Sequence, residues 1–142
     1  SSRRMLFHAW NVAEIGGMAL PPCHLLYMWH VTSSGHLNCL VFQRSCDLLL
    51  GAPFNKIGAS ALLLMIAQQA GLQPGRLTWM AGDVHLYLNH LEQARTQITR
   101  EPRPFPTMRL ARQIASIDDY RIEDFVVEGY APHPALPAPV AV

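Results

Sequence analysis

Two residues whose side chains could take part in a reaction, Cys23 and Arg44, lie about twenty positions apart in the sequence. Cys23 follows Pro21 and Pro22, and each proline fixes φ and removes a backbone donor, so we expect a stiff, non-helical lead-in to the thiol. A nearby guanidinium favours the thiolate, the nucleophilic form of cysteine. The planar fork of Arg44 also suits a phosphate or carboxylate. The pair predicts covalent catalysis on an anionic substrate.

A hairpin is needed to bring these two residues together. Residues 23–31 are mostly apolar and aromatic, which is typical of a strand. In residues 36–44, Leu37, Cys39 and Val41 occupy every second position, which also indicates a strand. The Thr-Ser-Ser-Gly sequence at 32–35 between them is turn chemistry. The sequence therefore predicts a hairpin with Cys23 and Arg44 at the same end.

A long helix is predicted after this hairpin. After a short loop from Asp47 to Pro53, the pattern favours a helix from Pro53 to about Gln69, which Gly71 ends. Its residues are apolar nearly all round, so we expect a central, buried helix.

The remaining elements are shorter. A strand is predicted at residues 77–81 and is expected to end at Gly82 and Asp83. A second helix is expected to begin near Asn89, which would be its N-cap, with Glu92 in capping-box position. Further strands are predicted at 3–11, 107–112 and 125–130, and a turn at 116–119. The predicted fold class is α+β, a single domain over 1–142 with a mixed β-sheet packed on a long buried central helix.

Composition excludes several classes of protein. The chain has 142 residues, half of them hydrophobic, with a net charge of +1 and pI near 7.8. No basic stripe points to a nucleic-acid partner, so a small-molecule ligand is expected. An odd count of three cysteines, without a signal-peptide pattern or a membrane-length apolar run, favours a reducing, cytoplasmic setting without disulfides or membrane contact.

Metal binding is not expected. Seven histidines and three cysteines are present, but neither Cys-x-x-Cys nor His-Glu-x-x-His spacing occurs. His85 and His90, five residues apart, would not share a helix face, and a structural hydrogen bond is the favoured interpretation of His90. Cys39 and Cys46 are interpreted as small buried hydrophobes.

Several segments together resemble one known family. Ala-Leu-Pro-Pro-Cys-His at 19–24 and Gln-Arg-Ser-Cys-Asp at 43–47 resemble thymidylate synthases, the folate-dependent enzymes that methylate dUMP. Further matching segments follow in the family's order, at 50–55, 82–90, 100–104, 128–134 and 138–142. The resemblance covers nearly the whole chain.

The resemblance implies a role for each matching residue. Cys23 would be the nucleophile that adds to C6 of the pyrimidine, and His85 and Tyr87 would bind the deoxyribose; on an extended segment both side chains face one way. Asn55 would recognise uracil, because a carboxamide offers both a donor and an acceptor. The phosphate would be held by Arg44, Ser45, Arg3 and Arg4.

The resemblance also implies a co-substrate and a homodimer. Reduced folate, 5,10-methylenetetrahydrofolate, would lie against Asp47, which also borders the nucleotide, and against Leu50, Gly51, Phe54 and Ala141. The tail, residues 131–142, would close over it as a lid. Arg3 and Arg4 would reach the phosphate of the partner subunit. No metal is implied.

Alternatives stay open at several positions. Asn55 is also well suited to cap a helix, and Arg3 and Arg4 to be solvated charges. Family members are about twice as long as this chain, so it is interpreted as a C-terminal fragment that is inactive alone. Lys56 to Ala59 departs from the family's usual Ile-Ala-Ser-Tyr and bears on substrate preference. A pyrimidine-nucleotide hydroxymethylase and a non-catalytic nucleotide-binding module are the alternative functions.

Overall fold

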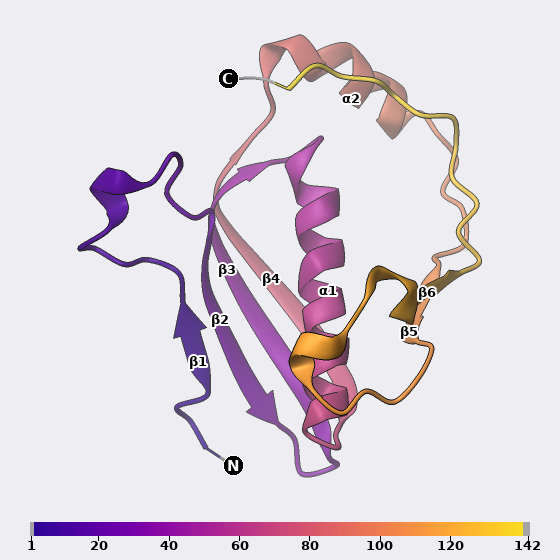
Figure 1. Cartoon of the computed structure of the whole chain (residues 1–142). Helices are drawn as coiled ribbons and strands as arrows, with labels where there is room; N and C mark the ends of the chain where they lie inside the picture. Colours follow the sequence, from indigo (N-terminus) through magenta and orange to yellow (C-terminus); the bar gives the residue numbers. More distant parts are fainter. Residues whose placement is uncertain (1, 141–142) are drawn as a thin grey trace.

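The computed structural model describes residues 2–140, which form two sheets and two α-helices (Figure 1). The larger sheet has the order β1-β2-β3-β4, and its strands are β1 (Leu6–His8), β2 (His24–Val31), β3 (His36–Asp47) and β4 (Gln73–His85). The first three are antiparallel neighbours, whereas β3 and β4 are parallel and are joined by α1 (Gly51–Gln69). The α+β class, with a mixed sheet packed on a long helix, is confirmed.

The hairpin of β2 and β3 forms as predicted. Gly35 takes a positive φ of 79° in the turn, and its amide donates to the Thr32 carbonyl over 3.1 Å. At the other end of the hairpin the Arg44 amide donates to the Cys23 carbonyl over 2.9 Å. Cys23 and Arg44 are thus neighbours, as the chemistry inferred from the sequence requires.

The core lies between this sheet and one face of α1. Alternate strand residues point toward the helix, which meets them with small side chains such as Ala59 and Ala67 that allow close approach. The buried strand residues are Tyr27, Trp29, Leu37, Cys39 and Val41. α1 is buried on the face toward the sheet, and its other faces are half-buried or exposed although their residues are apolar; Ile57 is 59% exposed.

Several element boundaries differ from the predictions by a few residues, and the differences at β4, β1 and the second helix bear most on the site. β4 runs through Gly82 to His85, because a glycine there allows close approach to β3: a Cβ would lie 3.0 Å from the Arg44 carbonyl oxygen. β1 is short and exposed at the sheet edge. The second helix, α2 (Leu91–Ile98), follows a 3₁₀ turn, η2 (Leu88–His90), so Asn89 lies inside that turn and is not the N-cap.

The smaller sheet pairs β5 (Thr107–Leu110) with β6 (Phe125–Glu128) beside α1. Between them the Arg112 guanidinium makes a two-point ion pair with Asp124, at 2.6 and 2.9 Å. Beyond β6 the chain runs extended along α2 (Figure 1). Over residues 2–140, no helix has the length and apolarity to span a membrane.

Candidate active site

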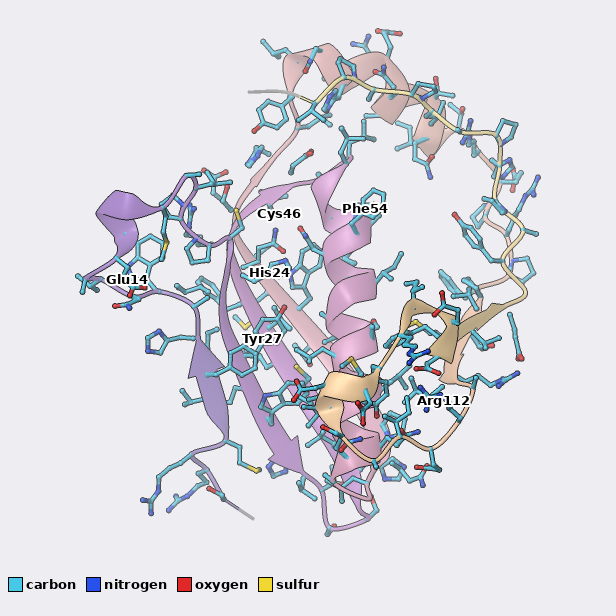
Figure 2. The ribbon with its side chains drawn as sticks, viewed as in Figure 1. Glu14, His24, Tyr27, Cys46, Phe54 and Arg112 are labelled. Carbon is cyan, nitrogen blue, oxygen red and sulfur yellow. The ribbon has the colours of Figure 1, made fainter. Side chains whose placement is uncertain are left out.

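The candidate residues gather where four segments end or begin at one edge of the larger sheet. β3 and β4 are parallel, so their carboxyl ends meet there, with Asp47 opposite His85 in register. β2 is antiparallel to β3 and begins at the same edge, and α1 starts four residues after β3 ends. Figure 2 shows His24 and Cys46 toward this end of the sheet and Phe54 on the first turns of α1. Ligands of open α/β sheets commonly bind at such an edge.

Arg44 fixes the lead-in to Cys23. Its Nε donates to the Pro22 carbonyl over 2.9 Å and its Nη2 to the Pro21 carbonyl over 2.7 Å. The guanidinium also lies 5.4 Å from the centre of the Trp10 ring. Cys23 itself is half-buried and carries a free thiol. The predicted stiff presentation of this thiol is therefore achieved by the prolines together with Arg44.

The other two cysteines are buried. Burial raises the pKa of the Cys39 thiol to about 11. Burial also raises the pKa of Cys46; Lys56 nearby opposes this rise, and Asp47 and Cys23 add to it. Both thiols are consequently neutral near pH 7, in keeping with their interpretation as small hydrophobes.

Asn55 lies one turn inside α1 and does not cap it, so that alternative is wrong. Its Oδ1 accepts a hydrogen bond of 2.9 Å from Nε2 of Gln43, a side chain only 2% exposed. The same Nε2 donates to the Ser45 carbonyl over 2.8 Å. Sequence reasoning missed Gln43, although a signal exists: it continues the inward-facing series that contains Leu37, Cys39 and Val41, so a polar residue there must be buried.

Asp47, three residues before the N-cap residue Leu50, accepts from backbone amides at the start of α1. Its Oδ2 accepts from the Gly51 amide and its Oδ1 from the Leu49 amide, each over 3.1 Å. Beyond these contacts, Leu50 is half-buried and Phe54 is 76% exposed. The start of α1 therefore presents an apolar and aromatic surface beside a carboxylate.

A row of three rings begins at the last residue of β4 and consists of His85, Tyr87 and His90. The His85 and Tyr87 centres are 5.1 Å apart at 81°, and those of Tyr87 and His90 are 5.7 Å apart at 77°. Such edge-to-face contacts are favourable for aromatic rings. His85 and Tyr87 are half-buried at the carboxyl edge of β4, whereas His90 is fully buried.

Three predicted site residues lie elsewhere or outside the described chain. Arg3 and Arg4 are exposed and precede β1 at the opposite end of the sheet, because β1 is antiparallel to β2 with Leu6 opposite Met28. At about 3.3 Å per residue, Arg4 lies on the order of 20 Å from Cys23 within one chain. Ala141 lies outside the described residues.

Lys56, which departs from the family pattern, lies with its ammonium 4.4 Å from the centre of the Trp79 ring. The described side chains of residues 2–140 include no group of three or more His, Cys, Asp or Glu arranged to hold a metal ion.

Comparison with known proteins identifies the family. The family model described as thymidylate synthase matches residues 1–142. Similar proteins include the thymidylate synthases of Cereibacter sphaeroides and Rhodopseudomonas palustris, which are 72% and 70% identical to the chain, and that of Zymomonas mobilis, 59% identical. Each alignment covers the whole chain and 48% of the relative, so the chain spans about half the length of these relatives. The chain belongs to the thymidylate synthase family.

Proposed function

We propose that the protein to which this chain belongs is a methyltransferase that converts dUMP to dTMP with 5,10-methylenetetrahydrofolate, and that this chain supplies the nucleophile and most of the nucleotide site. The observation that carries the proposal is the convergence of Cys23, Arg44, Asn55 and His85 at one edge of the sheet. The family match over the whole chain supports the same conclusion.

Cys23 is the nucleophile in this proposal. Its thiolate adds to C6 of the pyrimidine, and the electron pair released from the C5–C6 bond makes C5 a nucleophilic, enolate-like carbon. Reduced folate supplies the one-carbon unit and the hydride when bound. The stiff Pro21-Pro22 lead-in and the Arg44 hydrogen bonds support this role, because a nucleophile must be held in attack geometry.

Arg44 and Ser45 bind the phosphate. The guanidinium has five N–H donors, and its contacts with Pro21 and Pro22 use two of them, so three remain for phosphate oxygens. Ser45 adds a hydroxyl from the next position of β3. The same arginine can thus position the thiol and bind the anion.

Asn55 recognises the base, and Gln43 orients it. Asn55 Oδ1 accepts from Gln43 Nε2, and this contact fixes which end of the Asn55 carboxamide is the oxygen. The NH₂ group at the other end then serves as the donor. A donor beside an acceptor matches O4 and N3–H of uracil, whereas cytosine presents the reverse. His85 and Tyr87 bind the sugar from the end of β4.

The folate-side residues fit an aromatic co-substrate. Leu50 and the 76% exposed Phe54 offer apolar surface to flat rings. Gly51 lets the start of α1 approach Asp47 closely, because a Cβ there would lie 3.3 Å from the Asp47 Cβ. Asp47 keeps acceptor capacity, since a carboxylate has more lone pairs than its amide contacts use. Ala141, and the tail from 131 onward as a lid, complete this side in the proposal.

A homodimer completes the phosphate site. The sheet face turned away from α1 carries exposed apolar side chains, among them Leu6, Met28 and Met80, at 49%, 39% and 50% exposure. An apolar sheet face of this kind is typical of a protein interface. Arg3 and Arg4, on the order of 20 Å from Cys23 of their own chain, would then serve the partner's site, and a two-fold axis makes the exchange reciprocal.

Product analysis tests this function. The full-length protein is incubated with dUMP and 5,10-methylenetetrahydrofolate, and nucleotide and folate products are separated. We expect dTMP and dihydrofolate in equal amounts, and no product from dCMP. A hydroxymethylated nucleotide would favour the hydroxymethylase alternative, and binding of dUMP without any product would favour a non-catalytic nucleotide-binding protein.

A further inference from the structure

The carboxyl-terminal segment is held by side chains of the turn and helix beside it. His90 Nε2 lies 2.6 Å from the Pro139 carbonyl oxygen, and Gln93 Nε2 donates to the Pro137 carbonyl over 3.1 Å. Proline has no N–H and a fixed φ, so at 137 and 139 the segment offers carbonyl acceptors and little backbone freedom. Side-chain donors are therefore what can hold this part of the segment in position.

His90 is the buried member of this pair of donors. Its side chain has 0% exposure. A carbonyl can only accept, so Nε2 carries the proton, and the contact is a donated hydrogen bond. Nδ1 is buried and, among residues 2–140, has no partner. A buried nitrogen without a partner is costly, so an apolar ring would fill this space better if packing were the only requirement.

His90 is also the last ring of the row that begins at His85. Tyr87 stands between them and contacts both rings edge to face. Because closely packed interiors transmit strain, a displacement of the Tyr87 ring would act directly on the His90 ring that it touches. Tyr87 is therefore connected to the Pro139 carbonyl through the His90 ring, which contacts Tyr87 on one side and the carbonyl oxygen through Nε2.

We propose that His90 is a positioning residue that docks the carboxyl-terminal segment through the Pro139 carbonyl and couples this docking to occupation of the nucleotide site beside Tyr87. The proposal rests on the proposed function for the identity of the nucleotide. Gln93 assists at Pro137.

Two variants of the full-length protein separate the ring from its donor. His90→Phe keeps an aromatic ring against Tyr87 and loses the hydrogen bond, whereas His90→Gln keeps a donor near the Nε2 position and loses the ring. Arg95→Gln, at an exposed position of α2, is the matched control. Thermal unfolding of all variants reports any general loss of stability.

Carboxypeptidase digestion measures how often the carboxyl-terminal segment is undocked, and it needs neither folate nor turnover. When opening is fast, the rate of release of Val142, Ala141 and Val140 follows the undocked population. Losing one hydrogen bond should raise release about five- to tenfold in His90→Phe. His90→Gln should stay near the wild-type rate, and Arg95→Gln should match it. Saturating dUMP should slow release from the wild type and not from His90→Phe.

Two kinds of result would contradict the proposed role of His90. Wild-type release from His90→Phe, or equally fast release from His90→Phe and His90→Gln, would overturn the role of the donor even if both variants melt early. Binding of dUMP is measured separately by equilibrium dialysis. If dUMP binds without slowing wild-type release, the coupling is wrong; if dUMP does not bind, the proposed function fails and the digestion still reports on His90 and Pro139.

Discussion

Arg44 and Cys23 face each other across the open end of the β2–β3 hairpin, with the Arg44 amide donating to the Cys23 carbonyl over 2.9 Å. The guanidinium of the same residue reaches back to the carbonyls of Pro21 and Pro22. One arginine therefore holds the backbone at the thiol and at the two residues before it. A role in positioning the nucleophile follows in addition to its proposed role in binding phosphate.

Arg44→Lys in the full-length protein should reduce dTMP formation even when dUMP is saturating. Lysine keeps the charge but cannot donate to both proline carbonyls in the geometry of a guanidinium fork. Hydrogen bonds from charged groups contribute about 1.5–3 kcal/mol, so kcat should fall by about 10- to 100-fold. Steady-state kinetics measures this, with exposed Arg76→Lys as the control. An effect on the KM for dUMP alone would limit Arg44 to anion binding.

Thiol labelling should single out Cys23. Burial raises the pKa of Cys39 to about 11 and also raises that of Cys46, so both are neutral and inaccessible at pH 8. A coloured disulfide reagent should therefore modify one thiol per native chain rapidly and all three after denaturation. Rapid labelling that persists in Cys23→Ser would show that another cysteine is the reactive one.

Acid should weaken the pairing of Arg112 with Asp124 between β5 and β6. The Arg112 hydrogen bond, followed by that of the Arg121 amide, holds the pKa of Asp124 below its ordinary value. A lowered folded-state pKa gives stability that is full above the unfolded value of about 3.9 and is lost as pH falls further. In urea unfolding of the full-length protein between pH 6 and 3, Asp124→Asn should be less stable at pH 6 and converge with the wild type toward pH 3. A constant difference over that range would contradict the assignment.

Subunit exchange should reveal a shared site. Arg4→Glu and Cys23→Ser should each be inactive as homodimers, but a heterodimer of the two would have one site with both defects and one with neither. Random reassortment makes half the dimers heterodimers, so about a quarter of wild-type activity should return. The measurement is dTMP formation before and after exchange of the full-length variants. Demonstrated exchange without recovery would mean that Arg4 acts within its own chain or has no role in the site.

Local signals in the sequence were sufficient for the hairpin and the main helix. Thr32 to Gly35 are turn residues between two alternating runs, and Pro53 and Gly71 bracket α1 closely. These features depend on neighbours along the chain, which a sequence displays directly. The meeting of Cys23 and Arg44 followed from the hairpin alone.

Contacts between segments that are distant in the sequence were harder to predict. Gly82 was interpreted as the end of a strand, but its lack of a Cβ serves the close approach of β4 to Arg44 in β3. Asn55 was a possible helix cap in the sequence, but it is Asp47 that accepts from the first amide of α1, because of how α1 leaves β3. The Gln43 contact with Asn55 and the His90 contact with Pro139 likewise depend on packing between elements.

The most direct measurement concerns the nucleophile. In the full-length protein, Cys23→Ser should lower dTMP formation by at least about a thousandfold, because a hydroxyl ionises far less readily than a thiol, while dUMP binding stays measurable. Cys39→Ala, at a buried thiol on the helix-facing side of the sheet, is the control and should retain turnover once corrected for folded protein. Loss of turnover with retained dUMP binding, confined to Cys23→Ser, is the predicted result. Substantial dTMP formation by Cys23→Ser would contradict the account.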